Sequence, residues 1–281
     1  YCIVPYTRGK ERSRELDEII KEVEELKNSG YKEITLLGQN VNSYGKDLNN
    51  DTSFATLLEA VAKTGIDRIR FTTSHPWDFN ADMIDIIAKY DNIMPSIHLP
   101  VQSGNDEVLK LMGRRYSKES YLKLFDMIKE KIPDCTITTD IIVGFPGETE
   151  EDFTELSEFV QEVRFDRLGC FAYSQEEDTP AALLPDQIDE DVKNQRAEII
   201  MEQQMEIMQQ KGEEMIGKAV TVLTEGFDRY AECYFGRTAA DSPDIDGKVF
   251  FTAQGNKPYF GQFVKVRIED CVDCDLTGQR I

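Results

Sequence analysis

The chain has 281 residues, enough for one large hydrophobic core and a small second domain. Its 40% hydrophobic and 30% charged residues suit a soluble globular protein, and no apolar run reaches the length of a membrane span. The net charge of −21 argues against general binding to phosphate backbones. We therefore expect no membrane and no DNA partner, but a basic protein or an RNA contacted through a small basic patch.

Strand-like and helix-like segments alternate along most of the chain. Short apolar runs predict five strands, at 33–37, 68–72, 96–100, 136–143 and 167–173. Helical spacing or propensity marks the segments between and after them, at 54–62, 81–89, 106–111, 118–131 and 150–163. Repeated strand-then-helix order implies a parallel sheet covered by helices. Whether the sheet is doubly wound or a partial barrel, its functional loops lie at the carboxyl ends of the strands.

The C-terminal part has a different pattern. Residues 188–214 favour a long helix, and short strands follow at 219–223, 231–236, 247–251 and 263–268, separated by Gly, Pro and Asp turns. This pattern predicts a small all-β barrel or sandwich. We therefore divide the chain into a core at 1–185, a helical connection at 186–214 and a β-domain at 215–281.

Both histidines of the chain lie at predicted strand ends. His75 follows the second strand and His98 ends the third, so they belong to the same rim. They could bind polar groups of a substrate or cofactor, or act in proton transfer. No third ligand accompanies them, which argues against a zinc site.

The fourth and fifth strands end in segments suited to a nucleoside. Gly144 and Gly147 would let a ligand approach the backbone closely. The acidic helix start at Glu150 and Glu151 disfavours a phosphate there, because carboxylates already occupy the positive helix terminus. Phe171 on the fifth strand could stack on adenine.

The six cysteines are scattered, which indicates a reducing cytoplasm and no disulfide framework. Cys271 and Cys274 form a C-x-x-C pair in the β-domain tail, but no second pair or nearby His accompanies them, and we expect neither a redox nor a zinc role. Cys2 stands out instead, because a loop with Lys10, Arg12 and Arg14 and then the strand–helix units follow it. The chain has no initiator Met, and we interpret its first residues as the end of a longer motif.

These segments together resemble the radical-SAM methylthiotransferase family over essentially the whole chain. The resemblance implies a partial (β/α) TIM-like radical-SAM barrel followed by a small all-β TRAM domain that contacts the substrate. It also implies that Cys2 is the third ligand of a C-x3-C-x2-C motif holding a [4Fe-4S] cluster, with the other two cysteines upstream. A second cluster would lie on a further N-terminal domain.

The resemblance also implies roles for other residues and a reaction. S-adenosylmethionine (SAM) would be lined by residues of the strand-end segments, namely Gln39, His98, Gln102, Ser103, Glu148 and Phe171. Arg114 would lie near the substrate, and Arg8 would contact it if the substrate is RNA. An electron from flavodoxin or ferredoxin would cleave SAM to a radical that takes hydrogen from an unactivated C–H, after which sulfur and a methyl group are added.

The two halves of the chain resemble different branches of this family. The segments up to Ile142 are similar to the branch that methylthiolates N6-isopentenyladenosine at position 37 of tRNA. From Arg164 onward the sequence is similar to the branch that modifies an aspartate of ribosomal protein S12. We expect a tRNA substrate because the catalytic rim carries that branch's motifs; S12 is the alternative, and a non-catalytic RNA- or protein-binding fragment is a third.

Overall fold

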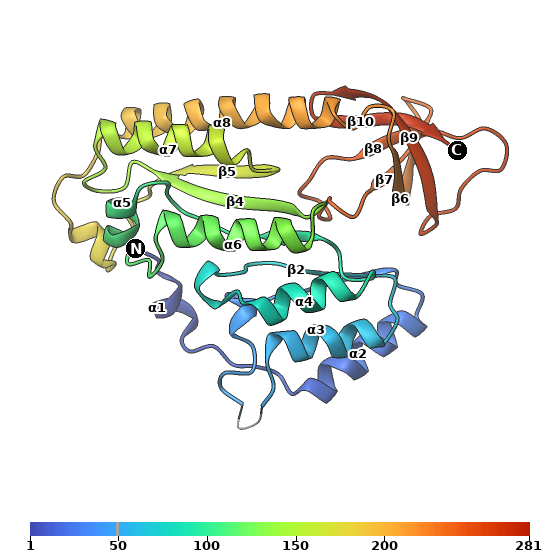
Figure 1. The fold of residues 1–281 in the computed structure, drawn as a ribbon, viewed down its shortest axis with the longest axis horizontal. Helices are drawn as coiled ribbons and strands as arrows, with labels where there is room; N and C mark the ends of the chain where they lie inside the picture. The colour runs from blue at the N-terminus through green and yellow to red at the C-terminus, as the bar shows by residue number, and fades with distance from the viewer. Residues whose placement is uncertain (49–50) are drawn as a thin grey trace. The chain divides into compact units, whose positions relative to one another are not determined.

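The computed structural model describes residues 1–48 and 51–281. They form two compact units, the first comprising Tyr1–Ile93 and Ile97–Gln204 and the second comprising Met94–Ser96 and Met205–Ile281. The long helix α8 (Glu190–Glu213) contributes residues to both units (Figure 1). The division of the chain into core, connection and β-domain at 185 and 214 stays a prediction.

The first unit is built on short strands that begin and end within about two residues of the predicted ones. These strands are β1 (Glu33–Leu36), β2 (Arg68–Phe71), β3 (Ser96–His98), β4 (Thr136–Val143) and β5 (Arg167–Ala172). β1 pairs with β2 in parallel, and β3, β4 and β5 follow one another in a second sheet. The backbone N–H of Ser74 donates to the carbonyl of His98 at 3.3 Å, which links the ends of β2 and β3. The predicted α/β class with its strand ends on one rim is confirmed.

Helices follow the strands, and most of them begin at a side-chain cap. They are α1 (Val4–Arg8), α2 (Leu16–Asn28), α3 (Phe54–Lys63), α4 (Ala81–Lys89), α5 (Asp106–Leu111), α6 (Lys118–Lys131) and α7 (Glu150–Val163). Ser117 and Thr149 form capping boxes at α6 and α7, where side chain and backbone satisfy each other's free groups. The prediction lacks α1 and α2, which lie on either side of the segment with Lys10, Arg12 and Arg14 that was interpreted as a loop.

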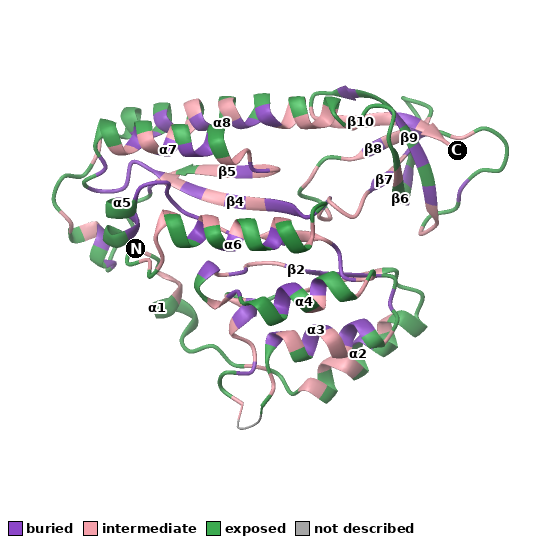
Figure 2. Ribbon diagram, in the orientation of Figure 1, coloured by how far each residue is buried: buried purple, intermediate pink, exposed green. Residues whose placement is uncertain are grey.

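The core of the first unit is rich in aromatic side chains. Tyr121 on α6 is almost fully buried and packs edge-on against Phe159 and Phe165, while its hydroxyl donates to the carbonyl of Leu99 at 2.8 Å. The helices show a buried and an exposed side in Figure 2, as amphipathic helices on a sheet should. α7 and the first part of α8 lie side by side, and Gln203 donates to the hydroxyl of Ser157 at 2.6 Å between them (Figure 1).

The second unit contains a closed five-stranded barrel. Its strands are β6 (Ala219–Asp228), β7 (Cys233–Arg237), β8 (Val249–Thr252), β9 (Phe263–Val272) and β10 (Asp275–Arg280), in the order β10-β8-β7-β6-β9. Val222, Tyr234, Phe251 and Val266 fill its interior. The predicted small β-domain is confirmed, although β10 is absent from the prediction.

The closure of the barrel depends on β10. This polar strand pairs with β8 in parallel and with β9 in antiparallel orientation, so its backbone is hydrogen-bonded on both sides. The predicted tail is therefore a hairpin, with Cys271 at the end of β9 and Cys274 in its turn at a φ of 67°. None of the helices formed by residues 1–48 and 51–281 combines the length and apolarity that a membrane crossing requires.

Candidate active site

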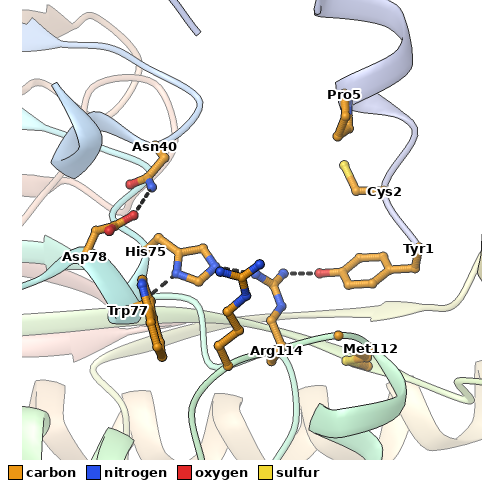
Figure 3. A pocket seen from close by; sticks show the side chains of 11 residues that line it. Tyr1, Cys2, Pro5, Asn40, His75, Trp77, Asp78, Met112 and Arg114 are labelled. Carbon is orange, nitrogen blue, oxygen red and sulfur yellow. Dashed lines mark hydrogen bonds between the residues drawn. The ribbon is translucent and has the colours of Figure 1, made fainter. Parts of the chain in front are cut away.

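A pocket of about 410 Å³ opens in the first unit where loops follow β1 and β2 (Figure 3). Its lining comes from four parts of the chain: Tyr1, Cys2 and Pro5; Asn40 in the loop after β1; His75, Trp77 and Asp78; and Met112 to Arg115. Strand ends and the first residues of the chain thus meet at one place. This is the rim on which an α/β protein of this kind places its functional groups.

Cys2 contributes an exposed free thiol to the pocket. In Figure 3 its sulfur lies on the side of Pro5, across the open space from Asn40, and Tyr1 beside it extends toward Arg114. The phenol ring of Tyr1 packs edge-on against Phe145 at 5.9 Å, which fixes the start of the chain against the first unit. The thiol therefore shares one pocket with the polar side chains of Asn40, His75 and Arg114.

Arg114 connects the polar side chains of the pocket. Its guanidinium donates to Nε2 of His75 at 2.8 Å and to the hydroxyl of Tyr1, and it lies 5.3 Å from the centre of the Tyr1 ring. The Tyr1 hydroxyl in turn donates to Oε1 of Gln102 at 2.6 Å. Because an arginine can only donate, Nε2 of His75 is the acceptor in this contact. Burial and the neighbouring Arg114 charge lower the pKa of His75, which favours the neutral imidazole.

The end of α5 aims Arg114 into the pocket. Gly113 has a φ of 73°, and its N–H donates to the carbonyl of Lys110, while the N–H of Arg114 donates to that of Leu109. These paired bonds close the helix with a glycine in the left-handed conformation. The chain turns sharply there, so the side chain after the glycine leaves the helix direction.

Two residues at strand ends have strained backbones. Thr73 follows β2 with a φ of 64°, and Gln102 follows β3 with a φ of 71°. Non-glycine residues rarely adopt this conformation and persist in it where the surrounding structure holds them. The N–H of Gln102 donates to Asp140 and its carbonyl accepts from Ile142, both at 2.9 Å, and these bonds fix the side chain against Tyr1.

His98 lies on β3 and is bound by the neighbouring strand. Its Nδ1 lies 2.9 Å from the hydroxyl of Thr138, and its Nε2 lies 3.2 Å from a carboxylate oxygen of Asp140. The side chain is 27% exposed. The structure thus holds His98 in one orientation at the rim, with Gln102 four residues further along the chain.

Glu148 has a buried carboxylate. Its Oε1 accepts from the backbone N–H of Gly144 at 2.8 Å and from Arg196 on α8 at 2.7 Å. Burial raises the pKa of Glu148, and the Gly144 N–H and Arg196 partly oppose this rise. Its Oε2 is buried with no hydrogen-bond partner in the described chain. The geometry therefore shows Glu148 anchoring α8 to the loop after β4.

The sequence comparisons identify the family. Residues 1–160 match the model of the Radical SAM superfamily, and residues 216–281 match that of the TRAM domain. The chain belongs to the radical SAM superfamily. Superfamily membership and the TRAM match confirm the fold class predicted for both parts of the chain.

Two similar proteins are both named tRNA-2-methylthio-N(6)-dimethylallyladenosine synthase. The protein of Staphylococcus epidermidis is 49% identical over 279 residues, covering 99% of this chain and 53% of the relative. That of Acetivibrio thermocellus is 47% identical over 280 residues, covering 99% of this chain and 57% of the relative. The chain thus spans about half the length of these relatives. The predicted resemblance to the methylthiotransferases is confirmed.

Among solved structures, methylornithine synthase aligns with a TM-score of 0.49 at 18% identity, covering 73% of this chain and 58% of that one.

Radical SAM membership implies a [4Fe-4S] cluster and SAM, so the pocket must be compared with both. The exposed Cys2 thiol fits as one cluster ligand, while residues 1–48 and 51–281 contain no group of three or more Cys, His, Asp or Glu side chains that could hold a metal. Asn40 Oδ1 and Arg114 Nε are buried without a hydrogen-bond partner among these residues. Both residues line the pocket, so a polar ligand such as the amino-acid part of SAM fits beside them.

The other predicted site residues lie in varied surroundings. Gln39 and Arg8 line a second cavity of about 650 Å³ beside β1, which shares Asn40 with the first pocket. Ser103 is buried, with its hydroxyl accepting from the N–H of Asn105, and Phe171 is 57% exposed on β5, as a stacking surface requires. Their roles, like those of His98, Gln102, Glu148 and Arg114, stay predictions.

The predicted site residues include Gln39 but neither Asn40 nor Asp78, which the pocket brings together. Asn40 donates to a carboxylate oxygen of Asp78 at 2.5 Å, which joins the loops after β1 and β2. Asn40 follows the predicted Gln39 by one position and faces the pocket in its place. A turn, unlike a strand, has no regular alternation of side chains. The sequence therefore does not show which of two adjacent amides in a turn faces a ligand.

Proposed function

We propose that the protein to which this chain belongs is a radical-SAM methylthiotransferase acting on N6-isopentenyladenosine in tRNA. Relatives that are 47–49% identical along 99% of the chain carry this reaction in their names. Their match includes the C-terminal part that the sequence analysis compared with the S12 branch. This continuous match is the observation that favours tRNA over ribosomal protein S12.

The pocket supports the proposal through residues of this chain. Cys2 would hold the cluster through its thiolate, together with ligands outside the described residues. Arg114, His75 and Asn40 would bind and orient the polar end of SAM, and Tyr1 would keep Arg114 in place. When bound, the cluster and SAM supply a carbon-centred radical able to take hydrogen from an unactivated C–H.

The test uses the full-length protein, with its cluster reconstituted in the absence of oxygen. It is given SAM, a reductant, and either isopentenylated tRNA or ribosomal protein S12. Mass spectrometry of the nucleosides and of the S12 peptides then reports which substrate gains a methylthio group. We expect the gain on tRNA, with unmodified adenosine tRNA as the control that should gain nothing.

Methylthiolation of S12 with none on the tRNA would show this proposal to be wrong and would favour the alternative branch. A second cluster, and an electron donor of the flavodoxin or ferredoxin type, follow as further proposals from the same resemblance. Iron counting on the full-length protein, with and without the Cys2→Ala substitution, tests the second cluster. Iron that survives in the variant is expected to belong to it.

A further inference from the structure

A further cavity of the first unit adjoins the candidate active site. It has a volume of about 540 Å³ and lies between the loop after β1, the start of α3 and the start of α4. Trp77 and Asp78 line both this cavity and the pocket that contains Cys2. In Figure 3 these two residues stand on the side of that pocket away from Cys2. We call the further cavity the Trp77 cavity, and a ligand that extends past Trp77 would enter it.

The one tryptophan of the chain stands where the two cavities meet. Trp77 is 56% exposed, although tryptophan side chains are on average well buried. Its backbone N–H donates to Nδ1 of His75 at 3.3 Å, and that of Asp78 donates to the carbonyl of His75 at 3.0 Å. This turn is held in place before any ligand binds, and it offers the flat face of an indole to both cavities.

Asn42 provides an unused acceptor in the lining of the Trp77 cavity. Its side chain is buried, and the residue is only 3% exposed. Its Nδ2 donates to Sδ of Met83 at 3.4 Å, whereas its Oδ1 has no hydrogen-bond partner among the described residues. A buried acceptor without a partner costs free energy, so this site favours a ligand that brings an N–H group.

The charges of the lining argue against a phosphate inside the cavity. Among the lining residues that the structure describes, the charged ones are Lys46, Asp51 and Asp78. The ammonium group of Lys46 is already paired with Asp78, which leaves Asp51 as an excess negative charge. A neutral, flat group with a donor on its edge fits this lining better than an anion does. An unpaired nucleobase is such a group, because its face stacks on aromatic rings and its edge forms hydrogen bonds.

We propose that the Trp77 cavity binds the base next in sequence to the reacting base of the substrate RNA. This neighbouring base stacks on the indole of Trp77 and donates from its edge to Oδ1 of Asn42. The two cavities share Trp77 and Asp78, so two consecutive nucleotides can place one base in each. The inference rests on the proposed function, which supplies the RNA, and it assigns Trp77 and Asn42 to the recognition of the sequence around the target.

The test measures binding of the full-length protein to three labelled stem-loop RNAs by fluorescence anisotropy. One carries isopentenyladenosine with adenine on both sides, and each of the others lacks one of these two neighbouring bases. Trp77→Ala should weaken binding of the intact RNA about tenfold and should cause no further loss with one of the two abasic RNAs. Equal losses with all three RNAs would overturn the stacking role. Tyr31→Ala removes a ring of similar exposure that lines neither cavity, and as the matched control it should change nothing.

Further variants separate stacking from bulk and from hydrogen bonding. Trp77→Phe keeps a ring and should bind the intact RNA nearly as the original protein does, whereas Trp77→Leu keeps only apolar volume and should bind like the alanine variant. Full affinity in the leucine variant would contradict stacking. Replacing the neighbouring adenine by purine, which lacks the amino group, should weaken binding to the original protein about threefold to tenfold but leave Asn42→Leu unaffected. Equal binding of adenine and purine by the original protein would remove Asn42 from the site.

The cofactor and the proposed function are tested separately. Equilibrium dialysis of SAM should give the same affinity for Trp77→Ala as for the original protein; a loss of SAM binding with normal RNA binding would assign the cavity to the cofactor and overturn the inference. Normal RNA binding by a Trp77→Ala enzyme that still methylthiolates tRNA overturns the inference and leaves the proposed function intact. A base-dependent loss in a protein that never methylthiolates tRNA supports the inference and contradicts the proposed function.

Discussion

Cys2 and Cys274 are both accessible to solvent, but they have different surroundings. Cys2 faces the pocket, whereas Cys274 lies in the β9–β10 turn, where its sulfur is 4.0 Å from the carbonyl of Met205. We predict that Cys2→Ala in the full-length protein abolishes cleavage of SAM, because the proposed cluster ligand is lost. Release of 5′-deoxyadenosine under dithionite measures this cleavage. Cys274→Ala is the control and should retain it, and cleavage that survives in the Cys2 variant would remove Cys2 from the ligand set.

The charge of Arg114 should control the titration of His75. Burial is the larger cause of the lowered pKa of His75, and the Arg114 charge is the next. Arg114→Gln keeps a donor but removes the charge, so we predict that the pKa of His75 rises toward its ordinary value of about 6.5. Because the chain has two histidines, an NMR titration of the imidazole signals resolves them, with His98→Gln to assign the other. An unchanged His75 pKa would mean that burial alone sets it.

One buried ion pair contributes to the attachment of α8. The side chains of Arg196 and Glu148 are 8% and 1% exposed, with 2.7 Å between the nitrogen and oxygen. Removing one partner leaves the other charge buried and unpaired, which is strongly destabilising. We predict that Arg196→Met lowers the free energy of unfolding by about 3 kcal/mol or more at neutral pH. Denaturant unfolding followed by circular dichroism measures it.

The same variant should show a definite pH dependence. Without Arg196 the pKa of Glu148 rises further, since Arg196 is one of the groups that lower it. A carboxyl with a raised folded-state pKa costs stability as pH rises from its unfolded to its folded pKa. The deficit should therefore be largest near neutral pH and shrink as pH falls toward about 4.3, the ordinary glutamate value. Glu150→Gln, which removes the exposed partner of Arg196, should cost about 1 kcal/mol or less.

At the level of elements, the sequence predicts those helices and strands whose apolar residues recur with a clear period. The alternation in β4 and the spacing in α6 are explicit in the residues, and both elements occur where expected. β10 is different, because Asp275–Arg280 is polar and short. It is a strand only because the backbones of β8 and β9 pair with it on both sides, and such tertiary pairing has no local signal.

The site shows the same limit. His75 and Arg114 are 39 positions apart, and their contact depends on Gly113 turning the end of α5 toward the loop after β2. The sequence analysis identified His75 as a candidate from its place at the rim, and Arg114 from the family resemblance. It did not foresee that Tyr1 would connect Arg114 to Gln102, because hydrogen bonds across more than a hundred positions depend on the completed fold.

For the whole molecule, charge distribution matters more than net charge. Under the proposed function, the affinity for RNA should fall with salt according to the number of phosphates that the cations contact. We predict that Lys257→Gln reduces the slope of log affinity against log salt by about 0.7, the value for one contact with a single strand. Titrations of the full-length protein at several salt concentrations give the slope. Lys248→Gln, in the loop between β7 and β8 at the opposite end of the barrel, is the control, and an equal reduction there would show that position on the barrel is irrelevant.

The closed barrel also has an evolutionary consequence. Every strand finds its partners inside the barrel, so the fold is fixed by the interior around Val222 and Phe251 and leaves no open strand edge to protect. The turn 229–232 and the loop 253–262 can then change in length and composition without weakening the strands. Relatives that share this barrel can therefore differ in the surface that these two loops present, while the pairing of the strands stays the same.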